Sequence, residues 1–422
     1  MPLDGLVSPY VGLVRGVREV LAGPEDVRLV TMWCESAHAG ALVGAPVAYA
    51  GGGSGTRPEE ARAAAIGEAV ERYSASYADP AGLVVGTAAE LGPAAVDPAR
   101  FALFTPAQYA TPGFRYAPFD ADTRLAWVRG RALPDGEPAW LPAQLVHLVP
   151  AADEPRICRA TSNGLACHDD PAEAALRAAL EVLERDAFMI TWNACLSWPR
   201  LEWTGNRELE SFVRTRVRPT GLDVRVIDLS AFWEVPCALG VARSTAAGTA
   251  PLGVGAAAAP TIERAVEKAI DEAVRVRTWA EALRVHAAEA ASEIRDFDDH
   301  VRFYAEDAHA PRAAFLDASD QVRHVDDVRP LRGTTPESRT ATICDRLASR
   351  SASAYAVDVT APDVRDAGLA VVRVVAPELC ALDVEHDARL LGGARLYEEP
   401  VRLGMRASFG EFDVNPDPHP FP

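Results

Sequence analysis

The chain has 422 residues, of which 49% are hydrophobic and 24% are charged, a composition that suits a folded protein with a large core. Its formal net charge of −18 argues against nucleic acid or an anionic membrane as the main partner, because phosphate-rich surfaces attract basic proteins. No uncharged apolar run reaches the length of about 18 residues that a membrane-spanning helix needs.

The N-terminus and the cysteines indicate the compartment. The first residues lack the basic start and the apolar run of a signal peptide. The seven cysteines are widely separated, and no two of them form a C-x-x-C pair. Scattered thiols in odd number are typical of reduced cysteines, so we expect a cytoplasmic protein.

Hydrophobic periodicity predicts strands and helices in alternation. Runs rich in β-branched residues predict three strands, at 27–32, 222–229 and 369–375. Alanine-rich segments of helical period predict three helices, at 58–77, 171–193 and 261–293. We expect 78–155 to be rich in loops with short strands, and the charged segment 294–340 to be a mobile or peripheral connection. The pattern predicts a mixed α and β (α+β) fold and leaves the strand order open.

Two of the predicted helices place pairs of glutamates on one face. In 58–77, Glu68 and Glu71 lie three residues apart, so their side chains project in the same direction. Glu181 and Glu184 repeat this spacing in the second helix, and Glu173 falls on nearly the same face as Glu184.

The third predicted helix carries Lys268, Glu272 and Arg275 along one stripe. Magnesium prefers oxygen ligands and bridges nucleotide phosphates through one or two carboxylates for each ion. Two glutamate pairs from separate helices could therefore hold two ions against one triphosphate. Lys268, Arg275 and Arg185 could neutralise the remaining phosphate charge.

Structural roles also explain these residues. Glu173 fits the third helical position of a capping box that begins at Asp170. The Glu–Arg and Lys–Glu pairs could be solvated ion pairs on helix surfaces. The glycine-rich segment 51–56 lacks the lysine and the spacing of a P-loop, so it predicts either a close approach of phosphates to the backbone or a plain turn.

The C-terminal segment 415–422 alternates proline with other residues. Proline fixes φ, so this tail is stiff and extended and cannot be helical. A disordered end is the usual structure of such a tail.

Three segments together resemble the signatures of the YcaO family: 59–74, 162–187 and 268–275. The resemblance extends from about residue 40 to the C-terminus and implies one catalytic domain at 41–422 after an N-terminal segment 1–40. It implies the YcaO fold, with β-sheets and with helices that line an ATP cleft. It also implies ATP and Mg2+ as ligands.

By position, the resemblance implies two sets of site residues. The magnesium-binding carboxylates would be Glu68, Glu71, Glu181 and Glu184. The nucleotide site would include Glu173, Arg185, Lys268, Glu272 and Arg275.

The chain departs from the family pattern at three positions. Gly53 or Ser54 stands where many members have lysine, Lys268 replaces the usual arginine, and Arg275 replaces the usual glutamine. Lysine is a point charge and lacks the fork of arginine, so we expect the phosphate contacts to differ in detail.

A tail of this form resembles that of the azoline-forming members. The resemblance implies that it lies in the active site, with the carboxylate of Pro422 and the side chain of His419 as catalytic groups. The implied reaction is the ATP-dependent cyclodehydration of Cys, Ser or Thr in a precursor peptide. We also expect a homodimer and a separate leader-binding partner that resembles ubiquitin-activating enzymes, because about 40 residues before the match are too few for a leader-binding domain. Thioamide formation by the same ATP site and a catalytically inactive scaffold remain the alternatives.

Overall fold

The computed structural model describes residues 3–38, 40, 50–149, 153–246, 248–286 and 293–421. The chain divides into two compact units. Unit 1 comprises Met1–Leu21, Leu29–Val182 and Gly333–Leu379. Unit 2 comprises Ala22–Arg28, Leu183–Arg332 and Cys380–Pro422.

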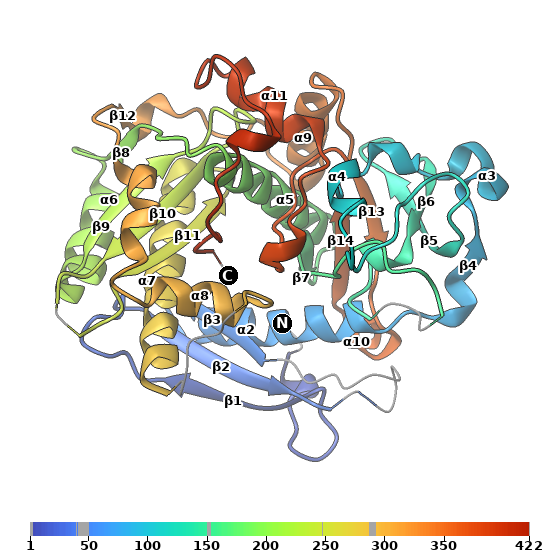
Figure 1. Cartoon of the computed structure of the whole chain (residues 1–422). Coiled ribbons are helices and arrows are strands. Elements are labelled where there is room, and N and C mark those ends of the chain that lie inside the picture. Colours follow the sequence, from blue (N-terminus) through green and yellow to red (C-terminus); the bar gives the residue numbers. More distant parts are fainter. Residues whose placement is uncertain are drawn as a thin grey trace. The chain divides into compact units, whose positions relative to one another are not determined.

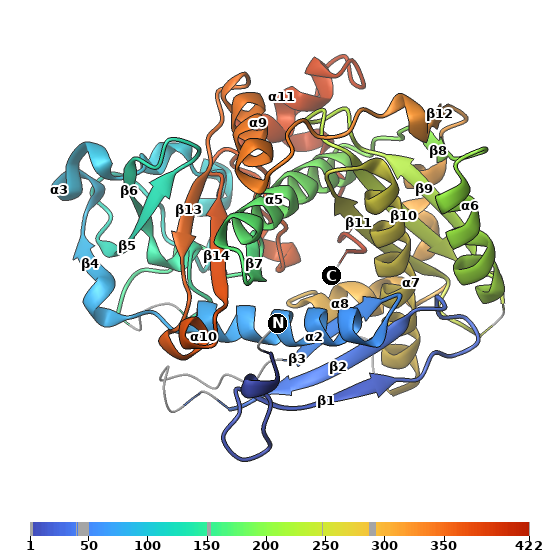
Figure 2. The same cartoon turned by 180° about the vertical axis from the view of Figure 1, so that it is seen from behind.

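Unit 1 begins with a three-stranded antiparallel sheet in the order β1-β2-β3. The helix α2 (Pro58–Ser76) follows β3 and packs against this sheet (Figure 2). The strands are β1 (Val14–Val20), β2 (Val30–Ser36) and β3 (Ala50–Gly55). Residues before position 40 therefore contribute two strands to the sheet that supports α2.

The glycines of β3 let α2 approach the sheet closely. A Cβ atom on Gly51 would lie 2.1 Å from the carbonyl oxygen of Ala65, and one on Gly53 would lie 2.3 Å from the Ala65 nitrogen. The helix presents small side chains to the strand, since Ala61, Ala65 and Ala69 are fully buried. Backbone cannot move aside as a side chain does, so this packing requires glycine at both strand positions.

The second sheet of unit 1 follows the order β4-β5-β13-β14-β7, and β6 pairs with β5. All of its pairings are antiparallel. Its strands are β4 (Leu83–Gly86), β5 (Leu125–Ala132), β6 (Pro138–Pro142), β7 (Leu165–His168), β13 (Tyr355–Asp358) and β14 (Ala370–Val375). The described part of unit 1 also contains the helices α3 (Ala88–Leu91), α4 (Pro106–Tyr109), α9 (Pro336–Ala348) and α10 (Pro362–Asp366).

One hydrophobic cluster joins both sheets of unit 1. Ile66 and Val70 of α2 pack in it with Leu141, Val357 and Val371 of the second sheet. The helix α2 thus has one face on each sheet, which fixes its rotation and the direction of its polar side chains.

Unit 2 contains a five-stranded sheet in the order β11-β10-β9-β8-β12 (Figure 1). The pairing of β12 with β8 is parallel and the others are antiparallel. The strands are β8 (Arg200–Glu202), β9 (Asp223–Asp228), β10 (Cys237–Arg243), β11 (Leu252–Ala258) and β12 (Val322–His324). The helix α7 (Ile262–His286) packs against β10 and β11. Three further helices are α6 (Arg207–Phe212), α8 (Phe297–Tyr304) and α11 (Ala394–Arg402).

The helix α5 (Pro171–Asn193) contributes residues up to Val182 to unit 1 and residues from Leu183 to unit 2. It begins at Pro171, which suits the first helical position because its missing N–H group would have no partner there. The carboxylate of Asp170 caps this end by accepting a hydrogen bond of 2.9 Å from the Ala172 nitrogen.

These elements confirm most of the sequence predictions. The mixed α and β class is confirmed, and α2, α5, β9 and β14 lie within a residue of the predicted bounds. The strand expected at 27–32 is shifted, since β2 covers Val30–Ser36. The predicted third helix is α7, which ends at His286, and the last predicted positions lie partly outside the described residues.

The expectation that 294–340 is a mobile or peripheral connection was wrong. This segment forms α8 and β12, and its side chains Tyr304, Leu316 and Val325 are buried. The helix α8 is amphipathic: its charged side chains lie on one face and its buried side chains on the other. A high content of charged residues therefore did not indicate an exposed connection here. Among the described residues, no helix combines the length and apolarity needed to cross a bilayer.

Candidate functional site

In unit 1, Glu68 is fixed by two hydrogen bonds. Its Oε2 atom accepts a bond of 2.6 Å from the backbone N–H of Gly52, and its Oε1 atom accepts one of 2.5 Å from Arg72. The Gly52 amide belongs to β3, an edge strand of its sheet. The carboxylate is therefore oriented before any ligand arrives.

Glu71, one turn further along α2, lies in an acidic environment. Burial, followed by the negative charges of Glu181 and Glu68, raises the pKa of Glu71 well above its usual range. A divalent cation would relieve this repulsion, and carboxylate oxygens are the ligands that magnesium prefers. Unit 1 thus brings together three of the four predicted metal ligands.

Arg373 is a buried cation in the same environment, and no motif in the sequence marks this residue. It stands on β14, and its Nη1 atom donates a hydrogen bond of 2.7 Å to the carbonyl oxygen of Thr161. Burial lowers the pKa of Arg373 to about 10, while the charges of Glu181 and Glu71 act in the opposite direction. This guanidinium offsets part of the acidic charge.

In unit 2, two carboxylates are held by one strand edge. The Ala258 amide donates a hydrogen bond of 3.0 Å to Glu184, and the Ala256 amide donates one of 2.8 Å to Glu272. Both amides belong to β11, an edge strand of its sheet. Amides two residues apart on a strand point in the same direction, so this edge places α5 and α7 carboxylates side by side.

Positive side chains surround these carboxylates. A guanidinium nitrogen of Arg185 lies 3.5 Å from the Glu184 carboxylate. Burial raises the pKa of Glu272, and the charges of Arg185, Arg275 and Lys268 act against that rise. Unit 2 therefore brings together the predicted nucleotide-site residues Arg185, Lys268, Glu272 and Arg275, with Glu184 beside them.

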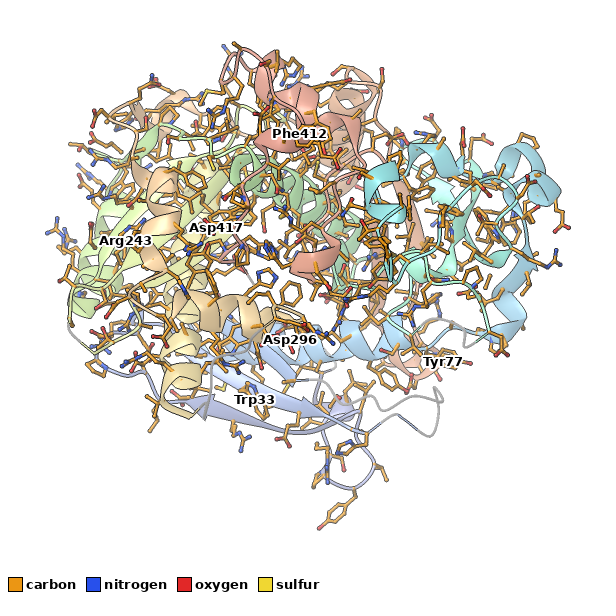
Figure 3. All side chains as sticks on the ribbon, in the orientation of Figure 1. Trp33, Tyr77, Arg243, Asp296, Phe412 and Asp417 are labelled. Atoms are coloured by element: carbon orange, nitrogen blue, oxygen red, sulfur yellow. The ribbon has the colours of Figure 1, made fainter. Side chains whose placement is uncertain are left out.

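Residues 415–421 of the proline-alternating tail lie in unit 2, where carbonyl groups of the tail accept hydrogen bonds from side chains. Proline lacks an N–H group, so the carbonyl oxygens are the main backbone groups that such a tail offers. Each acceptor receives a side-chain donor: Arg389 bonds Asn415 at 2.6 Å, Trp192 bonds Asp417 at 3.1 Å, and Tyr304 bonds Pro418 at 2.7 Å. The Asp417 side chain, labelled in Figure 3, also pairs with Arg312.

His419 is buried and both of its ring nitrogens are engaged. Nε2 lies 2.9 Å from the Asp383 carbonyl oxygen and 3.4 Å from its carboxylate, while Nδ1 accepts a bond of 3.3 Å from the Phe421 amide. The ring stacks on His300 with a centroid separation of 3.9 Å. In this arrangement His419 anchors the tail.

Phe421 brings the tail to the nucleotide-site residues of unit 2. Its ring is fully buried, lies 4.6 Å from that of Phe188, and is covered by the guanidinium of Arg185. Pro422, the second predicted catalytic residue, lies outside the described residues.

A buried ionic network fixes α5 next to Arg185. Asp186 is fully buried and accepts hydrogen bonds from the Trp233 indole at 2.8 Å, the Cys380 amide at 3.0 Å and the Arg395 guanidinium at 2.8 Å. Arg395 also pairs with Glu399 at 3.0 Å. Three segments of unit 2 thus hold the residue that follows Arg185.

Glu173 lies in unit 1, in the first turn of α5, and pairs with Arg177 at 2.8 Å. It does not form the capping box that the sequence allowed, since the Asp170 amide bonds to the ring of His168. Eight residues of helix place Glu173 about 12 Å along the axis from Glu181. Its assignment to the nucleotide site stays a prediction.

No group of three or more His, Cys, Asp or Glu side chains in the described part of the chain is arranged to enclose a metal ion. Magnesium does not require such a group, because it keeps several waters and takes one or two carboxylates together with phosphate oxygens. Within unit 1, the acids around Glu71 have the chemistry of magnesium ligands, and within unit 2 the cations beside Glu184 and Glu272 have the chemistry of a phosphate site.

The sequence matches a family described as YcaO cyclodehydratases that bind ATP and Mg2+, over residues 52–380. No curated protein matches the chain. A heterocyclase solved in complex with substrate and cofactor is 24% identical, with a TM-score of 0.80; the match covers 100% of this chain and 57% of that one.

Two further solved structures are similar. The heterocyclase TruD is 26% identical with a TM-score of 0.67, and the match covers 85% of this chain and 50% of TruD. The YcaO protein of Methanopyrus kandleri, bound with AMPPCP and Mg2+, is 22% identical with a TM-score of 0.62, and the match covers 87% of this chain and 86% of that protein. This chain thus spans only 57% and 50% of the two heterocyclases.

The family match covers most of the sequence and confirms the predicted family together with its ligands, ATP and Mg2+. The structural likeness confirms the predicted fold. The chain belongs to the YcaO family of ATP- and Mg2+-binding cyclodehydratases.

Proposed function

We propose that this chain uses ATP and Mg2+ to convert Cys, Ser or Thr residues of a ribosomally made precursor peptide to thiazolines or oxazolines. The observation that carries the proposal is the grouping of the predicted residues inside each unit. In unit 1, the Gly52 amide and Arg72 orient Glu68 near Glu71. In unit 2, the Ala256 amide holds Glu272 near Arg185, Lys268 and Arg275.

Glu68, Glu71 and Glu181 of unit 1 and Glu184 of unit 2 would each serve as a metal ligand through their carboxylate oxygens. Bound magnesium would supply positive charge to the phosphoryl oxygens. Lys268, Arg275 and Arg185 would bind phosphates in unit 2, with Glu272 and Glu173 completing the nucleotide site. Preorganised charges of this kind stabilise a phosphoryl group that gains charge during transfer.

In the proposed reaction, the thiol or hydroxyl group of the substrate side chain releases its proton to solvent and attacks the preceding backbone carbonyl, and the carbonyl oxygen becomes an oxyanion. The γ-phosphoryl group of ATP is transferred to that oxygen, and ADP is released. A base removes the amide proton, the C–O bond breaks, and phosphate leaves as the C=N bond forms. The peptide thereby loses the elements of one water molecule for each ring.

The tail would supply the base through the carboxylate of Pro422. Both ring nitrogens of His419 have partners, which supports an anchoring role for this histidine. Adding one residue after Pro422 tests the assignment, since unchanged turnover would exclude the carboxylate as the base.

Further proposals concern partners and compartment. We propose that a separate protein resembling ubiquitin-activating enzymes binds the leader of the precursor peptide, and co-purification with this chain tests that proposal. We also propose a homodimer, which light scattering tests. The seven free cysteines support a cytoplasmic location.

The decisive experiment combines this chain, its partner and a candidate precursor, with mass spectrometry and phosphate release as readouts. Azoline formation lowers the peptide mass by about 18 Da per ring, the mass of the water lost. An increase of about 16 Da, from exchange of oxygen for sulfur, would instead indicate thioamide formation. Glu184→Gln should abolish ATP hydrolysis; full modification with this variant would exclude the proposed site, and no hydrolysis by the wild type would indicate a scaffold.

A further inference from the structure

Two parts of the chain share one topology. In unit 1, the antiparallel strands β1, β2 and β3 are followed by α2, which packs on the sheet that they form. In unit 2, the antiparallel strands β9, β10 and β11 are followed by α7, which packs on β10 and β11. Each helix begins a few residues after its last strand.

Backbone contacts fix the correspondence between these two modules. A Cβ atom on Gly51 of β3 would lie 2.9 Å from the nitrogen of Ala69, and one on Gly255 of β11 would lie 2.4 Å from the nitrogen of Ala273. Glycine thus permits the same close approach of strand and helix in both units. If Gly51 corresponds to Gly255, then Ala69 corresponds to Ala273.

The same alignment pairs the carboxylates of Glu68 and Glu272. Glu68 accepts a hydrogen bond from the amide of Gly52, sixteen residues before it, at 2.6 Å. Glu272 accepts one from the amide of Ala256, also sixteen residues before it, at 2.8 Å. In each case the donor is the strand residue that follows the packing glycine. A glutamate is therefore fixed to a strand edge in the same way twice.

The helix sequences agree with this alignment. The apolar residues that match are buried in both helices, and the matching acids Glu68 and Glu272 hold the strand amides. The identical pairs are Glu59 and Glu263, Ala61 and Ala265, Ala65 and Ala269, Ile66 and Ile270, Glu68 and Glu272, Ala69 and Ala273, and Val70 and Val274.

Several positions outside the identical pairs differ in charge. Ala64 corresponds to Lys268, which is exposed, and Glu71 corresponds to Arg275, also exposed. Gly67 corresponds to Asp271, whose carboxylate pairs with Arg275 at 3.2 Å. The module of unit 1 thus carries a second acid, Glu71, one turn after Glu68. The module of unit 2 instead carries a cation on each side of Glu272 in the sequence.

We infer that the two modules are diverged copies of one building block, in which the β1–β3 and α2 module carries ligands of a divalent cation and the β9–β11 and α7 module carries phosphate-binding cations. Glu272 is then a positioning residue for the cations beside it, while its counterpart Glu68 binds metal. This inference rests on the proposed use of ATP and Mg2+, and it assigns opposite ligands to equivalent positions.

Calorimetry on the full chain tests the division of ligands without the peptide reaction. The probes are Mn2+ without nucleotide and tripolyphosphate without divalent cation. Glu71→Gln should weaken Mn2+ binding about tenfold and leave tripolyphosphate binding within about twofold. Arg275→Gln should weaken tripolyphosphate binding about tenfold and leave Mn2+ binding within about twofold. Lys268→Met, at another exposed position of α7, should have the same effect.

The two fixed glutamates form the matched pair. Glu68→Gln should raise the half-saturating metal concentration about tenfold. Glu272→Gln should leave that concentration within about twofold and raise the KM for ATP, a split that general loss of structure would not produce. An equal loss of metal affinity in both variants, or no change of KM in Glu272→Gln, would overturn the inference. If wild-type protein binds neither probe nor ATP, the proposed function itself fails.

Discussion

The guanidinium carbon of Arg185 lies 4.3 Å from the ring centroid of Phe421. Arg185 belongs to the second YcaO segment on α5, and Phe421 is the last described residue of the proline-alternating tail. The contact joins two features that lie far apart in the sequence, and it makes the tail part of the surroundings of the cation that we propose binds phosphate.

Replacing Phe421 with alanine should impair both ATP use and peptide modification. A buried cation–π contact contributes about 0.5–2 kcal/mol, so we expect kcat/KM for ATP to fall by between about twofold and thirtyfold. Steady-state phosphate release measures the effect. Phe412→Ala is the matched control, because this ring is fully exposed near the start of the tail (Figure 3). Equal loss in both variants would show that the Arg185 contact is unimportant.

Two glycine substitutions in unit 1 should have opposite effects on stability. Gly51→Ala would place Cβ 2.1 Å from a backbone oxygen of α2, so the helix must shift. We expect a loss of about 2 kcal/mol or more. Gly67→Ala lies within α2 with no atom within 4 Å of the new Cβ, and should stabilise the protein by about 0.5–1 kcal/mol. Chemical denaturation measures both, and similar signs would contradict the packing described.

Arg395→Met should destabilise unit 2 strongly. The substitution leaves the Asp186 charge buried without its main partner, and breaking a buried ion pair in this way costs about 3–5 kcal/mol. Arg402→Met removes a similar side chain whose pairing with Glu399 is partly solvated, so its effect should stay below about 1 kcal/mol. Thermal unfolding distinguishes them, and equal melting temperatures would refute the proposed importance of Asp186.

Unit 1 should lose stability in mild acid because of His147. Burial lowers the pKa of His147 to about 4, from an ordinary value of 6.5. The unfolded chain then binds more protons than the folded chain between these values, so stability falls as the pH drops from 6.5 towards 4. The loss from this one group should be about 2 kcal/mol at pH 5.

The variant His147→Gln checks that assignment. It removes the titrating group, so its free energy of unfolding should change less between pH 7 and pH 5 than that of the wild type. Denaturant titrations at the two pH values provide the comparison. Parallel changes in both proteins would assign the acid sensitivity to other groups.

The amino-acid sequence by itself determined the helices and the spacing of their carboxylates. Helical geometry is local, so a three-residue interval between Glu68 and Glu71 fixes a common face whatever the rest of the chain does. The bounds of α2 and α5 followed from periodicity, from Asp170 as a cap and from proline at the first helical position.

Only the tertiary structure decided which groups meet. Arg373 lies beside the acids of unit 1 because β14 pairs with β7, and no local pattern marks that position. His300 meets the tail although 119 residues separate it from His419. Such contacts depend on how sheets pair and how helices pack, and those long-range choices are made by the burial of side chains from the whole unit.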